Sequence, residues 1–235
     1  MVKGIYVAAI GLDARMKNLE TVANNLANIN TTGYKRGVPF SEILNQAGDV
    51  QIEHVTDYKQ GDLAETSNPL DLAISGKGFF VVQTNNGDEL TRGGNFKISD
   101  DGFLTDANGN KVRGKNGSIN LLSYNMDKNQ QLTITKDGQV KVGDNVVDSL
   151  LIAQPLDAQQ TVRTSGVNFN TGNGGFIAAD EKDYDIKQGY LEESNVNPIQ
   201  EMEEMIQLNT EYGSAQKMIN FLDQSLDEAN QIGKV

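Results

Sequence analysis

The chain has 235 residues, with 20 Lys plus Arg against 32 Asp plus Glu and a formal net charge of −12. A chain this acidic lacks the basic face that nucleic acids and anionic membrane surfaces require, so neither is an expected partner. It has no cysteine and one histidine, His54, which excludes disulfides, thiolate metal sites and multi-histidine metal centres. The longest apolar run, Ile5 to Ile10, is too short for a membrane span.

Residues from about 3 to 32 are predicted to form one helix, because apolar side chains recur there at alternating steps of three and four. Gly33 follows as a C-terminal stop. Asn24, Asn25, Asn28 and Asn30 crowd its last turns. Asparagine is a weak helix former, so these residues indicate either a frayed end or side-chain amides that pair with a packed neighbour.

The end of the chain predicts a second long helix. Asn197 is a suitable N-cap, Pro198 fits the first helical position, and Gly233 provides the stop. Both helices carry heptad spacing, which makes a seam for a partner helix. The seam residues expected to mediate self-assembly are Ile5, Leu12, Leu19, Val22, Leu26, Ile29, Met205, Leu208, Tyr212, Ala215, Ile219, Leu222 and Leu226.

Charge favours pairing of the two helices. Residues 198–232 carry a net charge of −6, whereas residues 1–36 carry +3. We therefore expect the two helices to pair as an antiparallel, coiled-coil-like hairpin, residues 1–33 with 198–235. Ala8, Ala9, Ala23 and Ala27 leave further surface for close approach, which suits packing against copies of the same chain. A helical hairpin that only caps a monomer stays the alternative.

Between the helices the apolar period becomes two, and X-Gly pairs such as Asn86-Gly87 and Asp137-Gly138 predict hairpin turns. Residues 66–188 are expected to form an antiparallel sandwich or irregular barrel. Polar segments on either side predict an extended connector over 34–65 and a return connector over 189–197. The fold class is therefore α+β, with long terminal helices flanking a central all-β domain.

None of the sequence motifs is strong evidence for a metal, phosphate or catalytic site. Asp106, Asn108 and Asn110 begin like a calcium loop but lack its glycine and distal glutamate, so a β-turn is the better interpretation. Gly76-Lys77-Gly78 precedes a strand and not a helix, which favours a glycine turn over a phosphate loop. His54 has no nucleophile motif beside it and is expected at the surface. The sequence thus predicts no catalytic residue, no metal site and no cofactor.

Three pairs of adjacent charged residues remain to be interpreted. Glu192-Glu193 and Glu203-Glu204 are adjacent in sequence, and neighbours on a helix point about 100° apart, so neither predicts an acid/base couple. Lys35-Arg36 is a short basic step, for which a solvated loop and an intersubunit salt bridge are both considered.

Three blocks of sequence together resemble the flagellar rod and hook protein family. The first runs from Asn24 to Arg36, the second from Asn68 to Val82 and continues through Thr91–Phe96, and the third from Gly189 to Asn197. The residues that carry this resemblance are Asn25, Leu26, Ala27, Asn28, Thr31, Gly33, Tyr34, Lys35, Asn68, Pro69, Leu70, Asp71, Gly76, Gly78, Phe79, Phe80, Gly189, Asn195 and Asn197.

The resemblance implies a structural subunit of a helical tube that transmits torque and surrounds an export channel. Its partners would be copies of itself, neighbouring rod and hook subunits, and the type III export apparatus. It would be exported without a cleaved signal peptide into the rod that crosses the periplasm. The short middle region resembles rod proteins more than hook protein, and the stretch 150–170 favours a proximal over a distal rod protein.

Two other classes of protein remain as alternatives to a rod subunit. A β-sandwich carbohydrate-active enzyme would need two carboxylates roughly 5–9.5 Å apart in a cleft. A secreted adhesin or binding module with coiled-coil ends would share the helix pattern.

Overall fold

The computed structural model describes residues 2–42, 51–122, 132–158 and 160–232. The chain forms two compact units. The helical unit comprises residues 1–29, 36–58 and 196–235, and the β unit comprises residues 30–35 and 59–195. A helix at each end of the chain and a β unit of antiparallel pairings confirm the α+β class.

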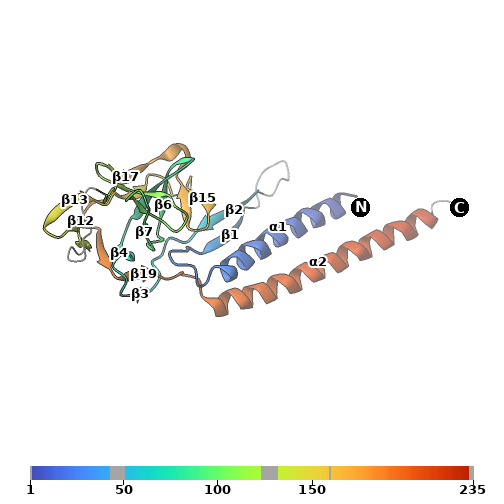
Figure 1. The fold of residues 1–235 in the computed structure, drawn as a ribbon. Helices are drawn as coiled ribbons and strands as arrows, with labels where there is room; N and C mark the ends of the chain where they lie inside the picture. The colour runs from blue at the N-terminus through green and yellow to red at the C-terminus, as the bar shows by residue number, and fades with distance from the viewer. Residues whose placement is uncertain (1, 43–50, 123–131, 159, 233–235) are drawn as a thin grey trace. The chain divides into compact units, whose positions relative to one another are not determined.

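The helical unit consists of α1, Val2–Ala27, and α2, Pro198–Ile232, with the hairpin of β1, Gly37–Glu42, and β2, Gln51–Thr56. Figure 1 shows α1 and α2 side by side. The N-cap prediction is confirmed, because the Asn197 Oδ1 atom accepts hydrogen bonds from the backbone N–H of Ile199, at 3.1 Å, and of Gln200, at 3.4 Å.

Helix α1 ends earlier than predicted. The helix stops at Ala27, and residues 28–33 follow as turns and a bend. The cause is the asparagine-rich end: the side-chain amide of Asn28 donates to the Asn24 carbonyl at 2.8 Å, which competes with regular helix geometry.

The β unit is built around one large antiparallel sheet, in which seven of the described strands follow the order β15-β16-β6-β5-β9-β8-β7. In the same sheet, β10 pairs with β9, and β14 pairs with β5 and β17. Smaller pairings are β11-β12-β13, β4 with β18, and β3 with β19. Its strands are β3 (Leu63–Glu65), β4 (Leu72–Gly76), β5 (Phe79–Thr84), β6 (Gly87–Thr91), β7 (Lys97–Ile98), β8 (Leu104–Thr105), β9 (Lys111–Gly114), β10 (Gly117–Ser118), β11 (Leu132–Ile134), β12 (Gln139–Val142), β13 (Asn145–Ser149), β14 (Ile152–Pro155), β15 (Val162–Ser165), β16 (Asn168–Asn170), β17 (Phe176–Ala178), β18 (Tyr184–Gln188) and β19 (Tyr190–Glu192).

Residues 34–65, expected as an extended connector, contain β1, β2 and β3. Strand β3 belongs to the β unit, where it pairs with β19, close to the C-terminal end of that unit. Strand β4 pairs over its whole length with β18. Two strands from the C-terminal part of the chain therefore complete the β unit beside strands formed more than a hundred residues earlier.

The core of the β unit is apolar and well packed. Phe80 is fully buried, and its ring meets that of Phe96 edge-on with centroids 5.1 Å apart. The buried cluster comprises Leu72, Ile74, Phe80, Val82, Phe96, Leu104, Val112, Ile119, Leu121, Leu132, Ile134, Val140, Val142, Leu150, Ile152, Tyr184 and Ile186. The predicted glycine turns are confirmed by left-handed backbone at Gly87, Gly102, Gly109, Gly117 and Gly138.

Gly94 provides a direct test of this packing. A Cβ atom at position 94 would lie 1.6 Å from the Leu72 carbonyl oxygen, so the backbone must shift. We expect Gly94→Ala to lower the free energy of unfolding of the β unit by about 3 kcal/mol or more. Gly109→Ala is the control: Gly109 has left-handed backbone and open space, so only a conformational cost of about 1–2 kcal/mol is expected. Equal losses in thermal or denaturant unfolding would contradict the steric account.

Candidate assembly surface and its buried anchors

The two long helices of the helical unit run antiparallel. Asn25, near the end of α1, bonds to Glu201 at the start of α2, whereas Arg15, earlier in α1, lies 3.6 Å from Glu211, later in α2. This order of contacts fits the prediction that the basic first helix lies against the acidic last one.

The predicted seam residues within α1 and α2 occupy the more buried sides of both helices, whereas Ile29 lies in the turn beyond the end of α1. Val22 is fully buried. The side chains of Ile5 and Leu226 lie outside the described residues. The others, each half-buried, are Leu12, Leu19, Leu26, Ile29, Met205, Leu208, Tyr212, Ala215, Ile219 and Leu222. Helix pairing therefore leaves much of the seam only partly covered.

A second stripe on α1 is exposed throughout. It follows the same steps of three and four, one residue out of phase with the seam, and it combines small and larger apolar side chains with two acids. Its members are Tyr6, Ala9, Asp13, Met16, Glu20, Ala23 and Ala27. A helix with two such stripes can contact a second helix as well as its partner within the chain.

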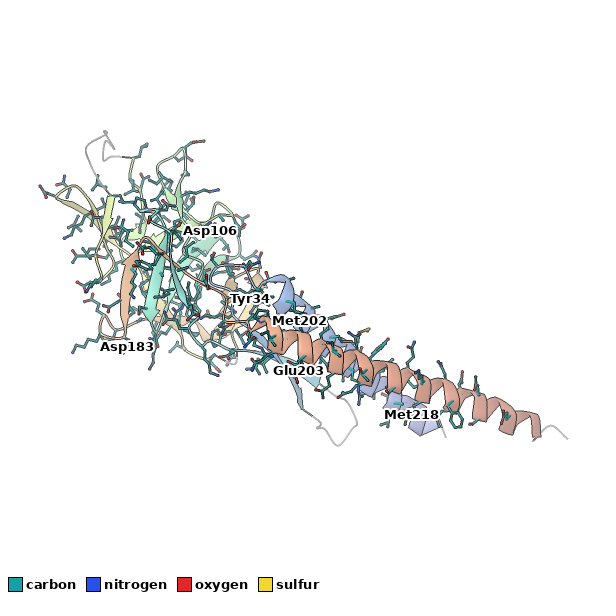
Figure 2. All side chains as sticks on the ribbon, turned by 90° about the horizontal axis from the view of Figure 1, so that it is seen from below. Tyr34, Asp106, Asp183, Met202, Glu203 and Met218 are labelled. Atoms are coloured by element: carbon teal, nitrogen blue, oxygen red, sulfur yellow. The ribbon has the colours of Figure 1, made fainter. Side chains whose placement is uncertain are left out.

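Helix α2 also exposes large apolar side chains away from the seam. Ile199 is 77% exposed and Ile206 is 68% exposed, with Met202 between them. Further along, Phe221 is 69% exposed and Met218 is nearly as open. Figure 2 shows Met202 and Glu203 at the start of α2 and Met218 beyond its middle. Isolated exposed apolar residues are ordinary, but repeated ones along a helix make it a candidate interaction surface.

Asn25 ties the end of α1 to β1. The Asn25 side chain is fully buried; its Nδ2 donates to the Gly37 carbonyl at 2.8 Å, and its Oδ1 accepts from the Gly37 N–H at 2.9 Å. The same Nδ2 donates to Glu201 Oε2 at 2.9 Å. Of the two interpretations of the asparagine-rich end, the structure supports amide pairing at Asn25, and the pairing is within the chain.

Glu201 is the buried carboxylate of the helical unit. Its side chain is 0% exposed and accepts hydrogen bonds from Asn25 and from the Arg36 guanidinium. Arg36 also reaches Glu204 at 2.9 Å. A buried carboxylate is tolerated only with a cation and N–H donors around it, and here each comes from a different segment.

The neighbouring Lys35 lies in the β unit. Its side chain is 0% exposed, and its Nζ donates to Glu192 Oε1 and to the Lys59 carbonyl, both at 2.6 Å. The solvated-loop interpretation of Lys35-Arg36 is therefore wrong, because both side chains form ion pairs within the chain. The helical argument is also wrong for Glu192-Glu193, because Glu192 ends strand β19, buried, while Glu193 is exposed.

Glu192 holds a second cation, Arg92. The Arg92 Nη1 atom donates to Glu192 Oε2 at 2.9 Å and to the Ile74 carbonyl at 3.1 Å, and its Nη2 donates to the Gly76 carbonyl at 2.6 Å. Burial lowers the pKa of the Arg92 guanidinium from its ordinary value, and the charge of Glu192 opposes that shift. The ring centre of Phe79, of the second sequence block, lies 5.2 Å from the Cζ atom of this guanidinium.

Other residues of the three sequence blocks shape the same region of the β unit. Tyr34 is buried, with the Arg163 guanidinium 4.2 Å from its ring centre. Gly33 has left-handed backbone, and a Cβ there would lie 2.4 Å from the backbone of Arg92. Its N–H donates to the Glu192 carbonyl at 2.7 Å. Asn195 donates through its backbone N–H to the Tyr34 carbonyl at 3.4 Å.

The remaining block residues serve turns and the core. Phe80 is fully buried in the core and Asp71 is nearly so, accepting from the Asn68 amide at 3.1 Å. Gly76 and Gly78 have left-handed backbone. Of the rest, Asn28, Thr31, Leu70 and Gly189 are half-buried, while Pro69 is exposed.

The candidate chemical motifs have structural roles in the described chain. The Asp106 carboxylate accepts from the N–H groups of Asn108 and Asn110 and from the Asn110 amide, as in a turn. Among the residues whose placement is described, no group of three or more His, Asp or Glu side chains could hold a metal ion. The side chain of His54 lies outside the described residues. No helix within the described ranges has the length and apolar character needed to cross a membrane.

Comparisons with known proteins agree with the three blocks. Residues 5–35 match the flagella basal body rod protein family, residues 73–142 the flagellar hook protein FlgE/F/G D1 domain, and residues 187–232 the flagellar basal body rod FlgEFG protein C-terminal family. The flagellar basal-body rod protein FlgF of Mesorhizobium japonicum is 30% identical, covering 97% of both chains. The chain belongs to the flagellar basal-body rod protein family.

Relatives named FlgF and relatives named FlgG are both similar to this chain. FlgF of Caulobacter vibrioides is 31% identical, with 96% of this chain and 97% of the relative aligned. FlgG of Agrobacterium fabrum is 32% identical, with 94% of this chain and 96% of the relative aligned. These relatives are structural rod proteins and not enzymes, so this rod-family chain is a structural protein, and neither the carbohydrate-active enzyme nor the adhesin is retained.

The Asn25 anchor can be tested by an isosteric change. Asn25→Asp would place a second carboxylate against buried Glu201 and remove the donor to it. We expect the helical unit to lose about 3–5 kcal/mol of stability at pH 7, because the added buried carboxylate has no cation of its own. The loss should shrink at pH 4, where one carboxylate can take up a proton. Thermal unfolding followed by helix circular dichroism measures both.

Asn24→Asp is the matched control, since Asn24 is the preceding residue and is exposed. A change of equal size in both variants, or one independent of pH, would show that Asn25 is not a buried anchor.

Proposed function

We propose that this chain is a rod subunit that assembles through its terminal helices with copies of itself and with neighbouring rod and hook subunits. The observation that carries the proposal is the second, exposed stripe of α1, together with Ile199, Met202 and Ile206 of α2. Half-buried seams and exposed stripes on both helices suit a bundle of more than two helices, which a single chain does not supply.

The stripes differ in side-chain size, which suits close packing. On α1 the exposed stripe has alanine at positions 9, 23 and 27, whereas α2 exposes isoleucine and methionine over its first turns. Large side chains pack into the space that small ones leave, as knobs into holes. We therefore propose that α2 of one subunit contacts the exposed stripe on α1 of the next, at its alanine positions, in a coiled-coil-like arrangement.

A contact between two different patches has a structural consequence. When one surface binds a different surface on the next copy, the contact repeats and builds a ring or a helical filament. A helical tube around an export channel, able to transmit torque, is such a filament. Passage through the type III export apparatus and a proximal position in the rod belong to the same proposal, and they rest on the sequence resemblance. The sandwich or barrel form of the β unit is proposed from its frequent hairpin turns.

The exposed stripe gives a direct assembly test. Ala23→Glu places a charge on an open helix face, so the monomer should unfold within about 0.5 kcal/mol of the parent chain. Assembly should be lost, because a desolvated charge without a partner disfavours the helix contact. Electron microscopy of purified material and motility of cells that carry the variant are the measurements.

Gln83→Glu adds the same charge to an exposed strand position of the β unit and should assemble normally. Normal rods and normal motility with Ala23→Glu would contradict the proposed surface.

The dilute monomer provides a second test. Its helices lack the other subunits, so their amides should exchange with solvent much faster than those of the β unit core, where Phe80 and Leu72 are fully buried. Hydrogen exchange followed by mass spectrometry measures both units in one sample. Equal protection of α1, α2 and the β unit core would mean that the helices are complete without partners.

A further inference from the structure

Strand β11 is the end strand of its sheet: among the described strands, β12 is the one that pairs with it. Just after β11, the Thr135 N–H donates to the Gln139 carbonyl of β12 at 3.0 Å. Because the N–H and C=O groups of successive residues in a strand point to alternate sides, those of Leu132 and Ile134 point away from β12. Such an outer edge is a template on which another strand can pair.

The side chain of Gln188, the last residue of β18, occupies that edge. Its Nε2 atom donates to the Leu132 carbonyl at 3.0 Å, and its Oε1 atom accepts from the Ile134 N–H at 3.1 Å. One residue of a parallel strand would bond to the same two backbone groups. The side-chain amide therefore takes the place of a strand residue.

The same amide is held from a third side. Its Nε2 atom also donates to the Pro69 carbonyl at 2.8 Å, so both N–H groups of the amide are used. Two residues earlier on β18, the Ile186 N–H donates to the Lys136 carbonyl at 2.8 Å. Strand β18 thus bonds the segment after β11 through its backbone, and β11 itself through the Gln188 side chain.

Space for an incoming strand lies beside this amide. A cavity of about 500 Å³ is lined in part by Leu132 and Thr133 of β11 and by Gln188. The side chains of Leu132 and Ile134 are buried in the core, whereas Thr133 is exposed. Pairing at the outer edge would therefore leave the core side chains in place.

We propose that Gln188 is an edge guard, whose amide keeps β11 from pairing with β11 of a second copy of this chain. A second copy is the occupant because the edge is self-complementary. In an antiparallel pair centred on Thr133, Leu132 of each strand lies opposite Ile134 of the other, with their hydrogen-bonding groups facing. The same patch then meets itself, so the contact closes as a dimer. The inference rests on the β unit alone and does not depend on the proposed helix assembly.

The chain has no cysteine, so an introduced one reports this pairing directly. In the antiparallel pair the two Thr133 residues form a non-hydrogen-bonded pair with Cα atoms about 4.5 Å apart, which suits a disulfide. We expect Thr133→Cys with Gln188→Met to form a disulfide-linked dimer about tenfold faster than Thr133→Cys alone. Methionine fills the same space but releases two backbone groups of β11, and each lost hydrogen bond is worth roughly twofold to tenfold. Copper phenanthroline is the oxidant, and non-reducing gel electrophoresis measures the rate.

Thr133→Cys with Asp185→Met is the matched control, because Asp185 is exposed on the same strand. It should form dimers at the rate of Thr133→Cys alone. Equal rates in the Gln188→Met and Asp185→Met variants would overturn the edge guard. Adding Ala23→Glu to every variant separates this contact from helix assembly, since the rates of disulfide formation at position 133 should then stay the same.

Hydrogen exchange in the unaltered chain tests the guard without any variant. The Ile134 N–H, whose acceptor is the Gln188 side chain, should be protected to within about tenfold of the Thr135 N–H, whose acceptor is a backbone carbonyl. Nuclear magnetic resonance resolves the two amides. If Gln188→Met does not fold, Gln188→Glu replaces it in the disulfide experiment, because it keeps the acceptor and loses both donors. An Ile134 amide that exchanges as fast as an unbonded one would overturn the proposal.

Discussion

Two buried carboxylates, Glu192 and Glu201, determine how the rest of this chain must be arranged. Each needs a cation, because an unpaired buried charge costs about 3–5 kcal/mol, a large part of the stability of a domain. The cations are the consecutive residues Lys35 and Arg36, of which the first binds Glu192 in the β unit and the second binds Glu201 in the helical unit. The chain therefore changes unit at a peptide bond with an ion pair on either side.

This constraint gives physical reasons for the signature sequence around the end of α1. Asn25 is required because its amide both accepts from and donates to the backbone of Gly37 and also donates to Glu201. An alanine side chain can make none of these hydrogen bonds, and an aspartate side chain cannot donate. Gly33 is required because any side chain there would collide with the backbone of Arg92. In this chain, Asn25 and Gly33 are thus set by hydrogen-bonding and steric requirements.

Local features of the fold could be predicted from the sequence, because local rules decide them. The cap at Asn197, the strand at Phe79–Thr84 and the glycine turns depend on a few neighbouring residues each. Lys35, Arg36 and Glu192 were visible only as charges. Their partners lie 100 or more residues away, so no local pattern indicates which charge will be buried. The absence of Lys35 from the surface is a tertiary effect that overrides the general exposure of lysine.

The two units differ in how completely they satisfy their own apolar surface. The β unit encloses an apolar core with fully buried aromatic and aliphatic side chains such as Phe80 and Leu150. The helical unit buries Val22 completely but leaves Ile199, Ile206 and Phe221 largely exposed. Its buried polar anchors fix α1, α2 and β1 at one end, so the helices keep their pairing order without a complete apolar core. In the proposed assembly, the polar anchors supply the specificity of helix pairing and the neighbouring subunits supply the missing burial of apolar side chains.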